Sequence, residues 1–253
     1  VIYMIGILLY IYFLFVGFLC ANKLFKEKDI YYKAWMGGVF GNVLLMAGIV
    51  PIAAVFGFTV ISHIILAVLA AVIYAAVCAA KKEQFFDISN GIEKSMDIKI
   101  LLYLIVPITL VIWILMTNHI LAPYSGGGVS SGQCTYGDLQ MHLGFVTGIA
   151  EQHKFPPDYV LLSGEKLNYP FFVDMLSSSL YLFGTTLRMA VLIPSYVISL
   201  LLTGGFYIFA YTITKRKSAA VLATVFFFIN GGFGFIYFLD GAKADIGNFT
   251  RIF

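Results

Sequence analysis

Long stretches without any charged side chain dominate the sequence. Five such stretches alternate with short charged segments, and they cover residues 1–22, 34–80, 100–137, 189–214 and 218–239. A helix needs about 20 mostly apolar residues to cross the hydrocarbon core of a bilayer. The second stretch is too long for one crossing, and Pro51 and Gly57 indicate a turn within it. The pattern therefore predicts six spans, at residues 2–21, 35–55, 58–80, 100–121, 189–214 and 218–239.

The charged segments between the spans indicate how the chain is threaded. Lysines gather at residues 22–33 and 81–99, and a basic triplet stands at 215–217. Because loops rich in Lys and Arg stay in the cytoplasm, we expect these segments inside and residues 122–170 outside. Residues 171–187 then cannot cross the membrane, and we interpret them as a short interfacial or re-entrant helix. The alternative is a seventh span, which would place the basic triplet outside.

The outer segment at 122–170 contains a predicted surface helix. The run GDLQMHLGFVTGIAEQH places Leu139, Leu143, Val146 and Ile149/Ala150 on one face at helical spacing. An amphipathic helix of this kind lies along a membrane surface. The preceding SGGGVSSG indicates a flexible lead-in, and FPP after the helix ends it, because proline cannot continue a helix.

These elements predict an all-α fold class. The chain is expected to be a polytopic integral membrane protein with about six to seven transmembrane helices and an extracytoplasmic loop that contains amphipathic surface helices. Residues 1–99 form an N-terminal region of three spans. Residues 100–253 form a second region, which comprises a span, the outer loop 122–170, the interfacial helix 171–187 and the spans 189–214 and 218–239.

The composition agrees with a membrane protein. Of 253 residues, 60% are hydrophobic and 11% are charged, whereas about a quarter of a soluble domain is charged. The net charge of +3 lies in short clusters between the spans, so a nucleic-acid partner is not expected. Cys20, Cys78 and Cys134 form neither a metal-binding pair nor a disulfide framework. The chain begins inside an apolar run and stops without a polar tail, so we expect a piece of a longer protein.

The predicted surface helix also carries most of the candidate chemistry. Asp138 stands at its start, where a carboxylate can cap the free backbone amides. His142 follows one turn later on the same face. As a functional group, Asp138 could be a general base for an incoming hydroxyl, and His142 could bind the substrate or a phosphate. Lys154 and Lys166 could hold a phosphate as point charges.

A divalent metal is an alternative ligand for this segment. Asp138 and His142 would supply two ligands, and Asp158 or Glu165 would complete the set. The sequence contains no compact set of ligands, so no metal-binding residues are assigned.

A longer pattern in the same segment resembles a known family. The run YGDLQMHLGFVTGIAEQHKFPPDYVLLSGEKLNYPFF, which lies between a span and a short polar helix, is similar to the first outer loop of membrane glycosyltransferases of the GT-C type. The similarity covers about residues 100–240 and rests on the ordered set D, H, FPP, G and L-x-Y-P. Two departures are that three spans precede this region and that the family's later spans and phosphate-binding residues would lie beyond Phe253.

This resemblance implies a reaction. GT-C enzymes take a sugar from a polyprenyl-phosphate carrier and pass it to a lipid, glycan or protein acceptor outside the cytoplasm. Asp138 matches the family's outer-loop acid, which would be the general base of an inverting transfer. Glu151, Lys154 and the segment GEKLNYP, with Lys166 and Tyr169, fall in the elements that frame the family's site and are expected to bind substrate or phosphate. Membrane lipids and the lipid-linked donor are the expected partners.

Four further residues and several glycines have structural and functional interpretations. His63, within a span, is expected to bond to a neighbouring helix, and His119 borders the outer loop. Asp174 either lines a cavity or faces water at the interface, and Arg188 is either an interfacial anchor, which is favoured, or a phosphate ligand. Paired glycines such as Gly37-Gly38 and Gly41 indicate close helix packing.

Two other function classes remain open at this point. A transporter or flippase subunit would place its ionisable groups near the middle of the spans. A non-enzymatic membrane assembly protein would tolerate the loss of charges from the outer loop.

Overall fold

The computed structural model describes residues 4–86, 88, 91–123, 128–131 and 137–229, apart from the side chain of His119. The chain divides into two compact units, Val1–Gly205 and Phe206–Phe253. The candidate site lies entirely in the first unit. In the second unit, the rings of Phe206 and Phe227 stack with their centroids 4.2 Å apart.

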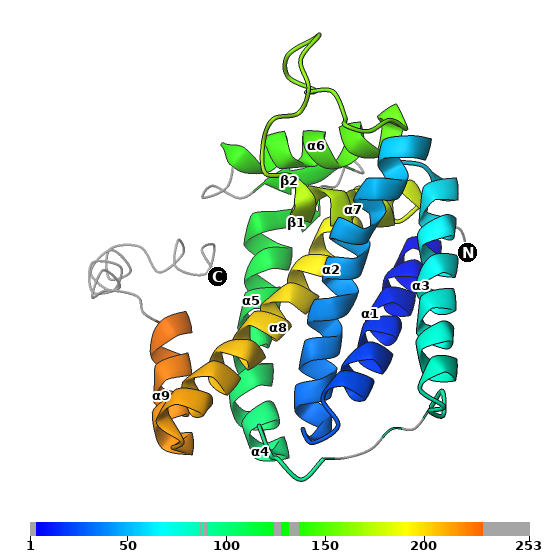
Figure 1. Ribbon diagram of the computed structural model, residues 1–253. Coiled ribbons are helices and arrows are strands. Elements are labelled where there is room, and N and C mark those ends of the chain that lie inside the picture. Colours follow the sequence, from blue (N-terminus) through cyan, green and yellow to red (C-terminus); the bar gives the residue numbers. More distant parts are fainter. Residues whose placement is uncertain (1–3, 87, 89–90, 124–127, 132–136, 230–253) are drawn as a thin grey trace, which may run out of the picture. The chain divides into compact units, whose positions relative to one another are not determined.

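Five helices in the described part of the chain are long and apolar enough to cross a membrane (Figure 1). They are α1 (Ile5–Leu24), α2 (Ile30–Phe56), α3 (Val60–Ala80), a composite helix over residues 98–120, and α8 (Leu187–Thr214). The composite helix consists of α4 (Ile98–Ile100), the π-helical turn η2 (Leu101–Ile105), α5 (Val106–Leu115) and the π-helical turn η3 (Met116–Ile120). The chain is therefore a predominantly helical membrane protein, as the charge-free stretches predict.

The sixth predicted span, 218–239, is described only in part. Helix α9 (Lys217–Phe228) is apolar but has 12 residues. The remainder of that prediction lies outside the described residues.

The turn predicted from Pro51 and Gly57 is present, but it lies at Gly57 and not at Pro51. Helix α2 continues through Pro51 to Phe56, and Gly57 ends it with a φ of 74°. A transmembrane helix tolerates an internal proline because neighbouring groups can satisfy the carbonyl that loses its hydrogen bond. The two predicted spans on either side of Gly57 are separate helices, since Gly57 provides the break.

Glycines bring α1 and α2 into backbone contact. A Cβ atom on Gly17 would lie 2.2 Å from the carbonyl oxygen of Gly37 and 2.4 Å from the amide nitrogen of Gly41. A Cβ atom on Gly41 would lie 2.6 Å from the carbonyl oxygen of Phe13. No side chain fits at these positions, so the close packing predicted for Gly37 and Gly41 is confirmed. Small residues promote this approach in membrane helices, where van der Waals contact replaces the hydrophobic effect.

Two shorter helices cover the end of the bundle at which α1 begins and α2 ends (Figure 1). They are α6 (Asp138–Gln152), close to the predicted surface helix, and α7 (Phe172–Leu182). Helix α7 has 11 residues and is about 16 Å long, roughly half the thickness of a hydrocarbon core.

Helices α6 and α7 lie side by side and run in the same direction. His142 contacts Asp174, and the hydroxyl of Ser178 donates to the carbonyl oxygen of Val146, 2.9 Å away. Both contacts join residues that are 32 positions apart, which fixes a constant register between the two helices.

Helix α7 is buried between α6 and the bundle. Six consecutive residues, Met175 to Leu180, are buried together with Asp174. One apolar core extends from the bundle residues Phe13, Ile49 and Phe58 to Phe145 and Ile149 of α6 and to Met175 of α7. Residues on both sides of the predicted boundary at residue 99 therefore contribute to the same core.

The segment that leads into α6 contains β-structure that the sequence did not indicate. Strands β1 (Leu121–Pro123) and β2 (Val129–Ser131) pair in antiparallel fashion, with Leu121 opposite Ser131. β2 falls within the run SGGGVSSG, which was predicted to be a flexible lead-in. The fold is thus mainly, but not purely, α-helical.

We predict that Gly41→Ala lowers the stability of the protein. The added methyl group would collide with backbone atoms of Phe13 and Leu14, which cannot move unless α1 and α2 separate. Overpacking of this kind costs about 1–3 kcal/mol. The midpoint of thermal unfolding in detergent measures the effect. Gly204→Ala is the control, because its added Cβ would lie 3.9 Å from the nearest neighbouring atom, Cδ1 of Trp35. Equal midpoints for the two variants would contradict the close packing.

Candidate functional site

A cavity of about 370 Å³ opens between α6, α7 and α8. Apolar side chains from all three helices form most of its wall, including Leu143, Val173 and Val191. The polar groups that line it are His142, Tyr169, Asp174, Ser177 and Ser195. An apolar cavity with a few convergent polar groups is the usual form of a ligand site.

His142 and Asp174 form an ion-pairing contact at this cavity. The Nδ1 atom of His142 lies 3.1 Å from each carboxylate oxygen of Asp174. Since an ionised carboxylate can only accept hydrogen bonds, Nδ1 carries the proton in this contact. In a neutral imidazole, Nε2 then has a free lone pair and can act as a base.

Burial controls the chemistry of Asp174. Its residue surface is 7% exposed. Loss of water raises the pKa of Asp174, while the hydrogen bond from His142 and its charge act in the opposite direction. A carboxylate that is held out of water beside an imidazole is typical of functional sites, although structural ion pairs show similar shifts.

Aromatic rings hold the imidazole of His142 in place. Its centroid lies 5.6 Å from that of Tyr169 and 5.8 Å from that of Phe145, both in edge-to-face geometry. Two residues predicted to bind substrate, His142 and Tyr169, are therefore brought together. Asp174 is the third residue of this group. It belongs to α7, in the segment 171–187 that the sequence left open as an interfacial helix or a span. Asp174 lines the cavity.

Asp138 lies at the start of α6 but does not cap it. Gly137 is the N-cap residue, and no side-chain hydrogen bond caps this helix end. The capping interpretation is therefore wrong, although a carboxylate in the first turn still interacts favourably with the helix dipole. Asp138 is exposed. The described residues that line the cavity of His142 do not include it.

The two predicted phosphate-binding lysines contact a common carboxylate. Lys154 pairs with Asp158, and the Nζ atom of Lys166 lies 2.7 Å from Asp158 Oδ1. Hydrogen bonds from Lys154 and Lys166 lower the pKa of Asp158. The cluster is largely exposed and carries one more positive than negative charge, so it retains a weak attraction for anions.

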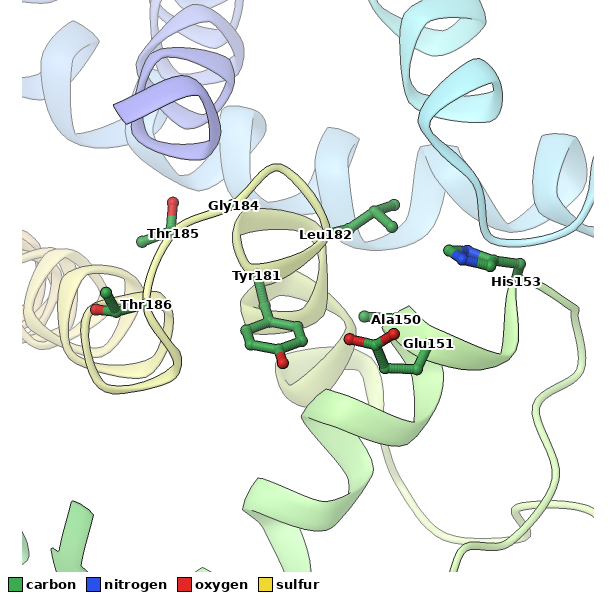
Figure 2. A pocket seen from close by; sticks show the side chains of 8 residues that line it. All are labelled: Ala150, Glu151, His153, Tyr181, Leu182, Gly184, Thr185 and Thr186. Atoms are coloured by element: carbon green, nitrogen blue, oxygen red, sulfur yellow. The ribbon is translucent and has the colours of Figure 1, made fainter. Parts of the chain in front are cut away.

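Glu151 lies in a second cavity of about 360 Å³ at the other ends of α6 and α7 (Figure 2). Tyr181 of α7 lines the same cavity, close to the carboxylate of Glu151. Burial raises the pKa of Tyr181, and Glu151 adds to this effect. His153, Thr185 and Thr186 also line the cavity, so its wall offers several hydrogen-bonding groups.

Other polar residues singled out in the sequence have structural contacts. His63 is fully buried, with Nδ1 2.7 Å from the carbonyl oxygen of Thr59 and Nε2 2.9 Å from the hydroxyl of Ser179 on α7. Its predicted bond to a neighbouring helix is confirmed. Arg188 donates to the carbonyl oxygens of Leu121 and Thr117 at 2.8 and 3.0 Å. Arg188 thus ties the start of α8 to the end of the composite helix.

The structure does not gather the ligands that a metal site at Asp138 would need. Among the described residues, no three His, Cys, Asp or Glu side chains come close enough together to hold a metal ion. Asp158, a proposed ligand, is bound instead by the two lysines.

Sequence reasoning did not pair Asp174 with His142. The available signal was an acid in an otherwise apolar helix, which is costly unless the acid has a partner. The identity of the partner depends on the register between α6 and α7, and that register is a tertiary property.

Comparison of the chain with known protein families, with curated proteins and with solved structures finds no match.

We predict that Asp174→Asn raises thermal stability at neutral pH. Because burial raises the pKa of Asp174 in the folded state, ionisation of this group destabilises the fold, and wild-type stability falls as the pH rises through that pKa. The uncharged amide removes this loss. The unfolding midpoint, measured in detergent from pH 3 to pH 8, should favour the variant at high pH and converge with wild type at low pH.

The exposed residue Asp138 provides the control for this measurement. Asp138→Asn should leave the pH profile of stability close to that of wild type. An Asp174→Asn protein that is less stable than wild type at pH 7 would show that His142 stabilises the carboxylate by more than its burial costs.

Proposed function

We propose that the protein is a membrane glycosyltransferase of the GT-C type. It would move a sugar from a polyprenyl-phosphate carrier to an extracytoplasmic acceptor with inversion at the anomeric carbon. The observation that carries this proposal is the contact of the buried Asp174 with the partly exposed His142 in a largely apolar cavity at the end of the membrane helices. A lipid-borne substrate can reach a site of this kind from the bilayer.

The pair supplies the base that an inverting transfer needs. The acceptor hydroxyl attacks the anomeric carbon, the bond from that carbon to the carrier's phosphate oxygen breaks, and the polyprenyl phosphate leaves. His142 Nε2 takes the proton from the attacking hydroxyl, while Asp174 stabilises the imidazolium that forms. This assignment moves the base from Asp138, which the family resemblance favoured, to a residue one turn further along the same helix.

The charged groups around the two cavities suggest where the substrates bind. The carrier's phosphate carries negative charge, and the Lys154–Asp158–Lys166 cluster has a net positive charge. The Glu151 cavity offers a carboxylate and several hydroxyl groups, which suit the hydroxyl groups of an acceptor. We therefore assign the carrier phosphate to the lysine cluster and the part of the acceptor remote from its attacking hydroxyl to the Glu151 cavity, because the attacking hydroxyl itself has to reach His142.

The distribution of charge favours an extracytoplasmic site. In the first unit, the end of the bundle that carries α6 and α7 has three basic residues, Lys154, Lys166 and Arg188. The segments at the opposite end, residues 22–33 and 81–99, contain eight lysines. Since basic loops remain in the cytoplasm, α6 and α7 would face outward.

A transfer assay with the full-length protein tests the proposed base. Vesicles that contain the protein are supplied with polyprenyl-phosphate sugars and an acceptor, and the initial rate is measured at matched expression. His142→Asn and Asp174→Asn should each lower the rate, and His142→Asn by about 10²–10⁴-fold, the usual contribution of a general base. Asp138→Asn should retain most of the activity.

Other outcomes for the three variants would change the assignment of the base or of the reaction. Loss of activity in Asp138→Asn alone would return the base to Asp138. Full activity in all three variants, with wild type active, would show that the reaction does not use this site. Unfolding midpoints of the variants distinguish a lost base from a lost fold.

A second kinetic measurement tests the acceptor cavity. Glu151→Gln removes the only carboxylate among the described residues that line this cavity, so the KM for the acceptor should rise while the KM for the donor stays unchanged. Glu165→Gln is the matched control, because Glu165 is an exposed carboxylate that does not line the cavity. A selective rise in the donor KM would reverse the assignment of the two cavities.

A further inference from the structure

A third cavity lies at the opposite end of the bundle from α6 and α7. It has a volume of about 250 Å³ and is enclosed by α1, α2, α3 and the residues that follow α3. Its wall is apolar along the membrane helices, with Val16, Leu44 and Ile73 among the lining residues. Leu24 and Ile73 line it and are themselves exposed on the surface of the helices, so the cavity opens sideways, where a bilayer would contact the protein.

The charged groups of this cavity lie at the end of the cavity nearest the C-termini of α1 and α3. Lys23, Lys81 and Glu83 line it there. Glu83 Oε1 lies 2.6 Å from the Nζ atom of Lys26, and Glu83 Oε2 lies 3.7 Å from that of Lys23. The hydrogen bond from Lys26, together with the charges of Lys26, Lys23 and Lys81, lowers the pKa of Glu83.

These groups leave an excess of positive charge at the mouth of the cavity. Two lysines, Lys23 and Lys81, line the cavity together with one carboxylate, that of Glu83. The side chain of Lys23 is 11% exposed and donates to the backbone carbonyl of Gln84, so its position is fixed by the protein. An anion that binds between Lys23 and Lys81 would balance the excess charge.

An anionic phospholipid has the chemistry that this cavity requires. The apolar wall calls for a hydrocarbon chain, and the lysines at the helix ends call for a negative group at the level of the membrane surface. Basic pockets between transmembrane helices on the cytoplasmic side characteristically bind anionic lipid headgroups. A soluble anion would leave the apolar wall uncovered, and a zwitterionic lipid would leave the charge unbalanced.

We propose that the cavity between α1, α2 and α3 binds an anionic phospholipid, with an acyl chain between the helices and the headgroup phosphate between Lys23 and Lys81. The site lies at the opposite end of the bundle from the candidate active site. This proposal does not depend on the proposed function.

Lipid binding to the full-length, delipidated protein in detergent tests this proposal. Phosphatidylglycerol and phosphatidylcholine with identical acyl chains are titrated separately, and bound lipid is counted by native mass spectrometry. Phosphatidylglycerol should bind more tightly. Lys23→Gln and Lys81→Gln should each weaken its binding by about fivefold and leave the weaker binding of phosphatidylcholine unchanged. Lys82→Gln is the matched control, because it removes the same charge from a residue that does not line the cavity.

A chemical probe checks where the lipid binds. Cys20 lines the cavity, whereas Cys78 is buried. In a Cys134→Ser background, labelling of Cys20 by a maleimide should be slowed by phosphatidylglycerol more than by phosphatidylcholine.

Three results would overturn the proposal. The first is equal affinity for the two lipids. The second is an effect of Lys82→Gln as large as that of Lys81→Gln. The third is protection of Cys20 by glycerol 3-phosphate alone, which would show that a soluble anion occupies the site. Neither measurement uses a sugar donor, so its outcome is separate from that of the transfer assay.

Discussion

The geometry of the candidate site depends on the contact at Ser178, whose hydroxyl lies 2.9 Å from the carbonyl oxygen of Val146 on α6 and 2.7 Å from that of Asp174 on its own helix. It joins two parallel helices in a single register, and the same offset of 32 residues places His142 opposite Asp174. The hydroxyl of Ser178 is fully buried, so its contact with Val146 is shielded from competition with water. A slip of one residue between α6 and α7 would turn Asp174 away from the imidazole by about 100° around the helix axis.

The burial of α7 has opposite consequences for stability and for chemistry. Most of its buried residues are apolar or are serines whose hydroxyl groups are satisfied within the protein, as with Ser178 and Ser179. Asp174 is the exception, since its charge is held largely away from water beside a single imidazole. An arrangement that lowers stability persists where function requires it, and this contrast with the neighbouring serines is the main reason to regard Asp174 as functional.

Much of the membrane architecture could be predicted because it follows from local composition. Charge-free stretches gave the five long helices to within a few residues at most ends, and the spacing of Leu139, Val146 and Ile149 gave helix α6. The errors arose where a local rule was overridden by its surroundings. Pro51 was taken with Gly57 to mark the turn, although only Gly57 provides it, and the pairing of β1 with β2 requires contacts between residues six to ten positions apart.

The site was predictable only in part, for a related reason. His142 was identified because it follows Asp138 by one turn in the predicted surface helix, and Tyr169 because it lies in the segment GEKLNYP that carries part of the family resemblance. The partnership of His142 with Asp174, and the capture of Lys154 and Lys166 by Asp158, depend on how the segment folds back on the bundle. No periodicity in the sequence encodes these contacts.

The contact at Gly57 changes how the first three helices should be regarded. A Cβ atom on this residue would lie 2.2 Å from the carbonyl oxygen of His153, so the turn between α2 and α3 touches the end of α6 directly. His63 of α3 and Gly6 of α1 likewise contact α7. The N-terminal helices therefore pack directly against α6 and α7 and support the site. In any related protein with a shorter N-terminus, other helices would have to supply that support.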